Sequence, residues 1–413
     1  MGTWIGSKRV AVLPCDARHP GIEALPADFR AVIQRRIHFD PDPVNGVDRS
    51  LRKYVHTVSY GRAVLDADIL ETVTIDWHQN PQDPDPTVNA QVANAHKEAI
   101  RLAGPSIGNY DYVLVVFPAL RLNAHAFYDA RTAYMFFDNP IGVWAHELIH
   151  VTTGFGDLYH PPAGRPLTPG NLDEMDTAGA MHPSTFTKLS IGWLDADAVP
   201  VVDLRQGPST HTLHSLALLQ PPPPDRSTAL RIPLSDRQNH YLLVESREWL
   251  DDYDRNSPRL SEGVPLEGVA VYDVDEAVWS PLWLRDQGLG TGEFYLDEFR
   301  RFRIDVGDRL VGGGYQVTVR PLPAPPRCAA IKAEVESLRA EIRDLQSQLD
   351  EPGADKPGLI RQIKALQGEI SRLNQEAAAL NCERWIASRM GILGQAPDDL
   401  LALKGRRFTG PTS

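Results

Sequence analysis

HELIHVTTGFGDLYH, residues 146–160, combines metal-binding side chains with the pattern of a helix that ends at a glycine. His146 and His150 are four positions apart, so on a helix both imidazoles project from one face, as two ligands of a tetrahedral Zn²⁺ require. Glu147 lies beside them and carries the carboxylate of a general base. The pattern predicts a hydrolytic site in which Glu147 activates a zinc-bound water for attack on a carbonyl group.

The pattern does not fix the third protein ligand. Gly154 is predicted to end the helix in the left-handed conformation and to turn the chain back toward the metal. Asp157 is the first residue beyond it with a side chain that binds zinc, and His160 is the next. Asp173 and Glu174 are further alternatives. We expect Asp157 to be the ligand, with His160 as the main alternative.

The residues before the motif indicate a buried helix preceded by a strand. Asn139 is expected to cap the helix, with Pro140 at its first position. Apolar residues surround the ligands at Ile141, Val143, Trp144, Ala145, Leu148, Ile149 and Val151. In the preceding run AYMFF, Tyr134 either lines the cleft and binds substrate backbone by strand addition or is an ordinary strand aromatic.

The length of 413 residues exceeds the usual size of one compact unit, about 100 to 200 residues, so several units are expected. Residues 1–199 alternate short β-rich runs with helical segments, and residues 200–326 contain strand patterns separated by turns. The β-rich runs of the first unit are RVAVLP, RAVLDADIL, TVTIDW, DYVLVVFP and AYMFF. The sequence therefore predicts an α+β protein with a β-rich, sandwich-like module after its first unit.

Residues 327–383 have the pattern of an antiparallel helical hairpin. Apolar residues recur at alternating four- and three-residue spacing, typical of a coiled-coil seam, on both sides of EPGADKPG. Two prolines and two glycines in that segment force a reversal. Cys328 and Cys382 are almost equally far from the reversal, so we predict a disulfide at the hairpin base; two unpaired buried thiols are the alternative. Residues 384–413 form a C-terminal tail.

Charge and hydropathy exclude several classes of partner. The net charge of −12 argues against nucleic acids and anionic membrane surfaces as partners, because both require a basic face. No apolar run is long enough for a transmembrane helix, and the start of the chain lacks the pattern of a signal peptide. The acidic runs DDYD at 251–254 and DVDE at 273–276 are candidates for Ca²⁺, with a solvated surface as the alternative.

Several other segments occur in a collinear order along residues 8–276. The motif is followed by GFGDLY, and DRSLRKYVHTVSYGRAVLDADI precedes it at 48–69. Further along are LDEMDTAGAMHPSTFTKLSIGWL at 172–194 and HYLLVESREWLDDYD and EGVAVYDVDE within 240–276. Together these segments resemble the immune inhibitor A family of secreted bacterial zinc metallopeptidases, which are zincins with an HExxH motif. Relative to that family, one residue is inserted between His150 and Gly154.

The resemblance implies a zincin-like catalytic domain at 1–199, built from a mixed sheet and an active-site helix. It implies His146 and His150 as zinc ligands, Asp157 as the third ligand, Glu147 as general base, and Met175 in the turn beneath the metal. It also implies a secreted, extracellular location. The helical hairpin has no counterpart in the family.

An oxyanion stabiliser is also expected, and Tyr159, His160 and His182 are the candidates, each with an ordinary structural role as the alternative. The leading hypothesis is a zinc endopeptidase that acts on protein or peptide substrates. A second hypothesis is an inactive or latent zincin with a closed metal site, which binds a protein partner through its hairpin and β-rich module. A third is a zinc hydrolase of small amides.

Overall fold

The computed structural model describes most of the first 379 residues. The described ranges are 2–18, 22–42, 46–77, 87–119, 124–127, 131–159, 168–218, 220–234, 239–255, 267–278, 281–297, 300–323, 326–349 and 356–379. His160, Cys382 and the tail at 384–413, for which the sequence carries predictions, lie outside these ranges.

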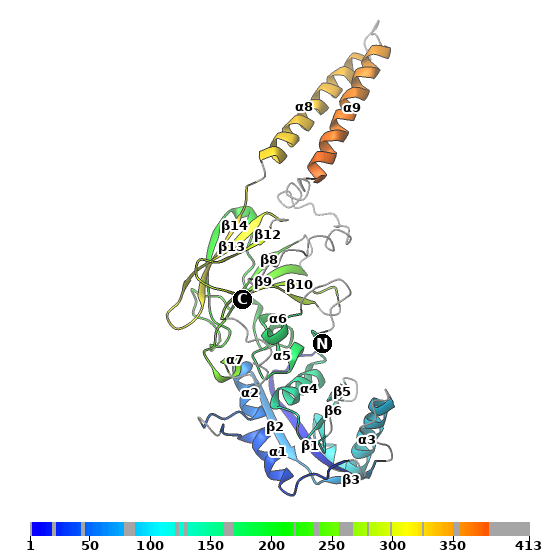
Figure 1. Cartoon of the computed structure of the whole chain (residues 1–413), viewed down its shortest axis with the longest axis vertical. Helices are drawn as coiled ribbons and strands as arrows, with labels where there is room; N and C mark the ends of the chain where they lie inside the picture. Colours follow the sequence, from blue (N-terminus) through cyan, green and yellow to red (C-terminus); the bar gives the residue numbers. More distant parts are fainter. Residues whose placement is uncertain are drawn as a thin grey trace, which may run out of the picture.

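A mixed six-stranded sheet forms the centre of the first unit (Figure 1). Its strands are β1 (Gly6–Arg18), β2 (Ala63–Ile69), β3 (Val73–Asp76), β4 (Tyr112–Phe117), β5 (His125–Phe127) and β6 (Thr132–Phe136). The order is β2-β1-β4-β6-β5, and β3 pairs with the second half of β1. All pairs are parallel except β5 with β6. The strands coincide with the five predicted runs, and only the three-residue β5 was not expected.

Helices cover both faces of this sheet because its central strands β1, β4 and β6 are apolar on both sides. Val10 and Val12 of β1 face a core shared with α1 (Phe29–His38), α2 (Leu51–Val58) and α4 (Ile141–Thr153). Ala11 and Leu13 face a second core, to which α3 (Thr87–Ala103) contributes Val92 and Ala99. The alternation in β1 therefore places the motif-bearing helix α4 on one face and α3 on the other.

Two antiparallel four-stranded sheets follow, within residues 200–326. Their strands are β7 (Ser209–Leu213), β8 (Ala229–Pro233), β9 (His240–Arg247), β10 (Gly268–Asp275), β11 (Leu282–Leu289), β12 (Phe294–Asp297), β13 (Phe302–Arg309) and β14 (Tyr315–Pro321). The orders are β11-β10-β9-β8 and β12-β13-β14-β7. Both sheets contribute to one apolar core, in which Leu242 and Val244 of β9 pack with Val317 and Val319 of β14.

Short helices lie along the chain between the longer elements. They are η1 (Gly104–Ile107), η3 (Gly170–Leu172), α5 (Glu174–Thr177), α6 (Thr185–Ser190), η4 (Ala196–Ala198), η5 (Leu204–Gln206) and α7 (Asp252–Arg255). Figure 1 shows α5 and α6 between α4 and the sheet of β8 to β10. Residues 173–190 therefore lie where the first unit meets the β-rich one.

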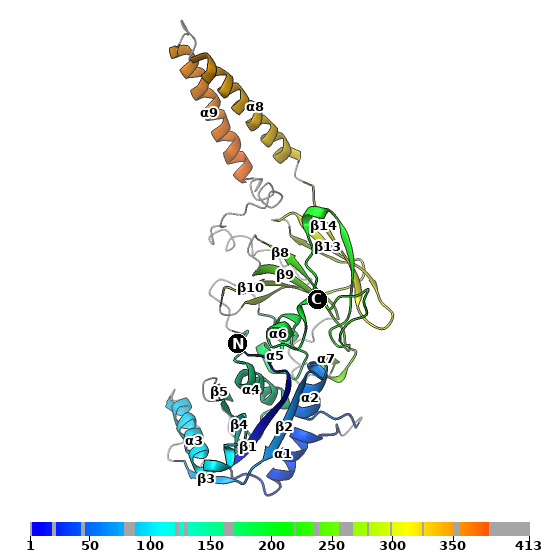
Figure 2. The ribbon, with the colours of Figure 1, turned by 180° about the vertical axis from the view of Figure 1, so that it is seen from behind.

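Helices α8 (Pro326–Leu349) and α9 (Lys356–Ala379) project together beyond the β-rich sheets (Figures 1 and 2). The start of α8 contacts the end of α9, since Cys328 and Ile331 pack with Leu373 and Ala377, so the helices are antiparallel. Arg327 Nε donates to Glu376 Oε1 at 2.6 Å. Cys328 is buried at the base, and its disulfide with Cys382 stays a prediction. No helix in the described ranges is long and apolar enough to cross a membrane.

Candidate metal centre

Helix α4 presents the motif from a rigid, buried segment. It runs from Ile141 to Thr153, and Gly154 ends it with a φ of 67°, donating its N–H to the carbonyl of His150 at 2.8 Å. The predicted glycine terminus is confirmed. The predicted Asn139 cap is wrong, because the Asn139 side-chain oxygen accepts from the N–H of Phe136 at 2.8 Å, and Pro140 occupies the N-cap position.

Close packing fixes the start of α4. A Cβ atom added to Gly142 would lie 2.1 Å from the carbonyl oxygen of Ala178 and 2.5 Å from the amide nitrogen of Ala180. Both contacts are backbone atoms of the turn after α5, which cannot rotate away as a side chain can. Glycine at position 142 therefore allows α4 to approach the segment that carries Glu174 and Met175.

Replacing Gly142 by alanine is expected to destabilise the protein by about 1–3 kcal/mol, because the helix and the turn must separate. The matched control is Gly368→Ala in α9, where a Cβ would meet nothing within 4 Å. That change should stabilise by up to about 1 kcal/mol, the difference in helix propensity. Urea unfolding of both variants measures the effect, and equal stability of the two would contradict the close approach.

Three side-chain atoms converge beside α4, two from its buried histidines and one from the half-buried Asp157. His146 Nε2 lies 2.9 Å from His150 Nε2, and Asp157 Oδ1 lies 3.0 Å from each of them. The Nδ1 atom of His146 lies 2.9 Å from the carbonyl oxygen of Glu174, and that of His150 lies 2.6 Å from the carbonyl oxygen of Phe155. Because a carbonyl can only accept, each Nδ1 carries a proton, which leaves Nε2 as the ring nitrogen that each histidine can turn to a metal ion.

This triangle fits a zinc ion. A tetrahedral Zn²⁺ with bonds of about 2.0–2.1 Å separates its ligand atoms by about 3.3 Å, close to the spacing of the three atoms. Within the described part of the chain, His146, His150 and Asp157 are the one group of three His, Cys, Asp or Glu side chains that is close enough to hold a metal. The outer hydrogen bonds of both histidines to carbonyl groups are those that orient metal-binding imidazoles.

The pKa shifts of His146 and Asp157 show that this group of side chains favours a positive charge, either a proton or a cation, between the two residues. Burial acts to lower the pKa of His146, but its hydrogen bond to Asp157 and the neighbouring Glu147 outweigh it and raise the pKa to about 9. Burial acts to raise the pKa of Asp157, but the two imidazoles outweigh it and hold the pKa well below its usual value. Burial lowers the pKa of His150. A divalent cation satisfies the same preference without a proton.

Glu147 lies beside the triangle with an unsatisfied carboxylate oxygen. Its side chain is buried, and Oε2 has no hydrogen-bond partner among the described residues. Burial raises the pKa of Glu147 to about 7; His146 acts to lower it and Asp157 to raise it. An unpartnered buried carboxylate is costly for folding, and such groups concentrate at functional sites.

The turn of α5 supports the triangle through two consecutive carbonyl groups. That of Glu174 accepts from His146, and that of Met175 accepts from the N–H of Leu158 at 2.9 Å, beside Asp157. Met175 is fully buried. One short segment therefore positions the first histidine and the loop of the third candidate ligand. Asp173 and Glu174 are the alternatives for the third metal ligand. Glu174 contacts His146 through its backbone carbonyl, and Asp173 supports the turn by accepting from the N–H of Met175.

Asp173 is the acceptor that holds this turn. It is fully buried, and its carboxylate accepts from the N–H of Met175 at 2.8 Å, the N–H of Ser184 at 2.8 Å and the hydroxyl of Thr187 at 2.7 Å. It thereby joins α5 to the first turn of α6. Neither Asp173 in this role nor the carbonyls of Phe155 and Glu174 could be identified from the motif.

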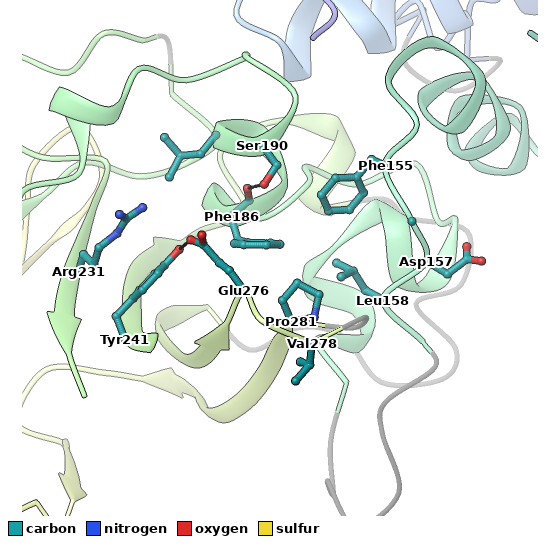
Figure 3. Close-up of a pocket in the computed structure, with 12 residues that line it drawn as sticks. Phe155, Asp157, Leu158, Phe186, Ser190, Arg231, Tyr241, Glu276, Val278 and Pro281 are labelled. Atoms are coloured by element: carbon teal, nitrogen blue, oxygen red, sulfur yellow. Dashed lines mark hydrogen bonds between the residues drawn. The ribbon is translucent and has the colours of Figure 1, made fainter. Parts of the chain in front are cut away.

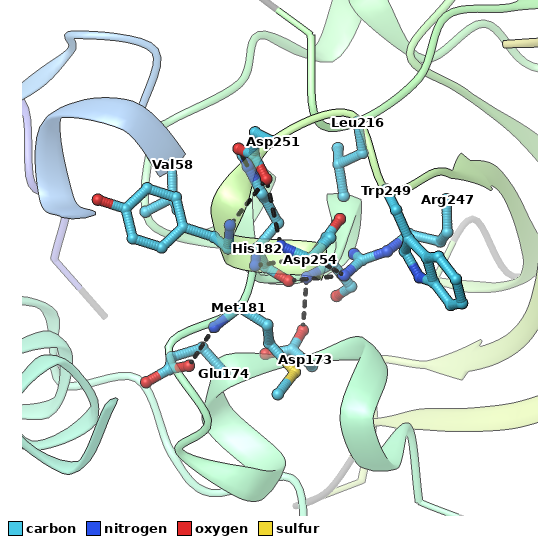
Figure 4. A network of polar contacts seen from close by, with 12 residues as sticks. Val58, Asp173, Glu174, Met181, His182, Leu216, Arg247, Trp249, Asp251 and Asp254 are labelled. Carbon is cyan, nitrogen blue, oxygen red and sulfur yellow. Dashed lines mark hydrogen bonds and ion pairs between the residues drawn. The ribbon is translucent and has the colours of Figure 1, made fainter. Parts of the chain in front are cut away.

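A buried polar network continues from α6 to strand β9 (Figure 4). The N–H of Thr185 donates to Glu245 Oε2 at 2.8 Å, and Arg247 donates to the carbonyl of His182 at 3.0 Å and to Asp254 at 3.1 Å. Lys188 is fully buried and donates to the carbonyl of Val58 at 2.7 Å and to the hydroxyl of Tyr60 at 2.7 Å. The contacts of Glu245 and Arg247 link the β-rich sheet to the supports of the metal centre, and those of Lys188 link α6 to the end of α2.

The oxyanion candidates are placed differently. His182 is fully buried in the network, with Nε2 2.6 Å from Asp251 Oδ2 and Nδ1 2.9 Å from Lys188 Nζ. Tyr159 is 42% exposed and stacks on His146 with ring centres 6.4 Å apart, so the structure brings it to the triangle. Tyr134 is 3% exposed, and β5 pairs with its strand, so of the two alternatives for Tyr134 the structure favours an ordinary strand aromatic.

The acidic runs proposed for Ca²⁺ have protein partners. Asp251 pairs with His182 and Asp254 with Arg247, while Asp273 lies 3.0 Å from His240 Nε2 and accepts from Arg285 Nε at 3.1 Å. These carboxylates therefore neutralise buried or half-buried basic side chains.

No known family model matches the chain, and none of the curated proteins compared with it is significantly similar. The geometry of the site therefore carries the functional argument.

Proposed function

We propose that this protein is a zinc-dependent endopeptidase with a zincin-like catalytic unit. The observation that supports it most is the convergence of His146 Nε2, His150 Nε2 and Asp157 Oδ1 at 2.9–3.0 Å, with Glu147 beside them. Three protein ligands and an adjacent buried carboxylate are the composition of a catalytic zinc site, which keeps one position for water. The peptide substrate and the extracellular location rest on the resemblance of the sequence segments.

The residues of the site have distinct roles in the proposed reaction. His146, His150 and Asp157 would hold Zn²⁺, which lowers the pKa of water and polarises the scissile carbonyl. Glu147 accepts the proton of the attacking water and returns it to the leaving amine. The carbonyl groups of Glu174 and Phe155 accept from Nδ1 of the two imidazoles and so favour the tautomer that presents Nε2 to the metal. Tyr159 is the candidate to bind the carbonyl oxygen of the substrate.

Metal analysis and proteolysis test the proposal together. The purified protein is expected to hold about one Zn²⁺ per chain and to cleave an unfolded protein such as reduced casein, and a chelator should abolish cleavage until zinc is restored. Asp157→Ala should lower zinc affinity at least about 10²-fold, because even outer-shell losses cost about 10- to 100-fold. The matched control is Asp203→Ala, at the N-cap of the short helix η5. Full zinc affinity of Asp157→Ala would assign the third ligand elsewhere.

The projecting helices favour a second candidate function. If the helices form the predicted coiled-coil hairpin, a protein partner has an accessible arm to bind (Figure 2). In that case the metal site would be closed, with His160 as a fourth ligand and no hydrolysis. Bound zinc without cleavage of any protein, peptide or small amide substrate would support this function; cleavage of small amides alone would support an amidase.

A further inference from the structure

A cavity of about 380 Å³ lies behind the loop that carries Asp157 (Figure 3). One wall is apolar and consists of Phe155 and Leu158 from this loop and Phe186 and Leu189 from α6. The facing wall comes from the β-rich unit and contains Arg231 of β8, Tyr241 of β9 and Glu276 just after β10. Phe155, Leu158 and Phe186 are buried, Leu189 is half-buried and Glu276 is exposed, so Glu276 marks the mouth of the cavity.

The loop of residues 155–158 separates this cavity from the metal centre. Gly156 and Asp157 also line the cavity, and Figure 3 shows the Asp157 carboxylate directed away from Phe186. On the other side of the loop, the carbonyl of Phe155 accepts from His150 and the N–H of Leu158 donates to Met175. A molecule that packs against Phe155 and Leu158 therefore contacts the segment that positions two of the three candidate metal ligands.

The polar end of the cavity carries one positive and one negative group. The guanidinium carbon of Arg231 lies 4.2 Å from the centre of the Tyr241 ring, and the Tyr241 hydroxyl donates to Glu276 Oε1 at 2.8 Å. Tyr241 thus spans the two charges. The Nε atom of Arg231 is buried and has no hydrogen-bond partner among the described residues. The backbone N–H of Arg231 donates to the carbonyl of Pro200 at 3.0 Å, which holds its strand in place.

We propose that this cavity binds a small zwitterion with an apolar side chain, a free apolar amino acid or a short peptide. Arg231 would pair with the carboxylate, Glu276 with the ammonium group, and Phe155, Leu158 and Phe186 would contact the apolar side chain. A volume of about 380 Å³ is within the range of small-molecule sites, about 300–1,000 Å³. The source of such a ligand rests on the proposed function, since hydrolysis of peptides releases these molecules.

Occupation of the cavity would affect the metal centre. A ligand packed against Phe155 and Leu158 favours one position of the loop, and the same loop sets the positions of His150 and Asp157. Because such coupling is reciprocal, a ligand that changes zinc affinity has its own affinity changed by zinc by the same factor. The cavity is thus a product-sensing site behind the proposed catalytic one.

Titration calorimetry with the full-length, zinc-loaded Glu147→Gln variant tests binding without turnover. L-phenylalanine, L-leucine and L-leucyl-L-phenylalanine are the probes, and saturable binding of one molecule per chain is expected for at least one of them. N-acetyl-L-phenylalanine and L-phenylalaninamide each lack one charge, and glycine lacks the apolar side chain. Each of these three should bind at least about tenfold more weakly, since one charged contact or the apolar contact is lost.

Variants identify the site. Arg231→Gln and Glu276→Gln should each weaken binding of the best probe at least about tenfold. The matched controls Arg205→Gln, at an exposed ion pair, and Glu71→Gln, whose side chain is 98% exposed, should leave it unchanged. Melting temperatures measured for all four variants show whether each is folded. Zinc affinity, measured by competition with a chelating dye, should change when the best probe is added at saturating concentration.

The outcomes separate this proposal from the proposed function. Absence of binding by all three probes, or binding that Arg231→Gln leaves intact in a folded variant, overturns the site. Tighter binding of the dipeptide than of the amino acids supports the site and identifies a peptide end as its ligand. Binding without any effect on zinc affinity overturns the coupling. Ligand binding is measured on a variant that does not need to hydrolyse a substrate. Binding can therefore be detected even if the wild-type protein cleaves no peptide, and peptide cleavage can be detected even if no probe binds.

Discussion

Replacing Glu147 by glutamine is expected to lower kcat for casein cleavage by about 10²- to 10⁴-fold while zinc content stays unchanged. The amide has nearly the volume of the carboxylate but cannot accept a proton. Glu147 does not belong to the group of His146, His150 and Asp157, so its replacement leaves the three candidate metal ligands in place. Metal analysis and a fluorescent casein assay on the same preparation measure both quantities.

Glu71→Gln is the matched control for this variant, because the same chemical change is made on a side chain that is 98% exposed. It should leave both activity and zinc content at wild-type levels. Unchanged activity of Glu147→Gln would remove Glu147 from the mechanism. Loss of zinc together with activity would instead show that Glu147 is needed to hold the metal, which would contradict its assignment as base.

Asp173→Ala is expected to destabilise the protein by on the order of 3–5 kcal/mol and to weaken zinc binding at least about tenfold. Three buried donors, from Met175, Ser184 and Thr187, lose their acceptor, and each unsatisfied donor costs about 1–3 kcal/mol. Removal of a fully buried carboxylate offsets part of this cost; its burial is also what raises the pKa of Asp173. Zinc binding weakens because the turn that orients His146 is released.

Urea unfolding and dye competition for zinc measure the two effects of Asp173→Ala. Asp203→Ala is the matched control, since Asp203 also accepts from a backbone N–H and an arginine but lies on an exposed turn, and it should cost less than about 1 kcal/mol. Asp173→Asn keeps one acceptor oxygen and should fall between wild type and alanine in both measurements. Zinc affinity that stays at the wild-type value in a folded Asp173→Ala protein would contradict a positioning role.

The parts of the structure that could be predicted from the sequence depend on local patterns. The apolar runs around Val10 and Val115 identify strands, because a strand buried on both faces has no polar positions. Gly154 identifies the end of the helix, because a left-handed residue there is most often glycine. By contrast, β5 contains three residues and no distinctive pattern, so its pairing with β6, which buries Tyr134, was not predicted.

The site could be predicted as far as its side chains follow one helix. His146 and His150 share a face by spacing alone, and Asp157 follows the turn. The acceptors that orient the two imidazoles are backbone carbonyls, which every residue has, so no residue type indicates them. His182 is near the motif in sequence but is drawn into the network by Asp251, which is 69 positions away. Contacts of that sequence separation have no local signal.

The buried pairing of Thr185 with Glu245, and of His182 with Arg247, has a consequence for how such a protein can change over generations. A gene rearrangement that separated the β-rich segment from the first unit would expose the charged side chains of Glu245 and Arg247. It would also leave the N–H of Thr185 without its acceptor. We therefore expect the two segments to be stable only together. Helices α8 and α9 pack chiefly on each other, so a single insertion or deletion between Pro321 and the tail can add or remove them whole.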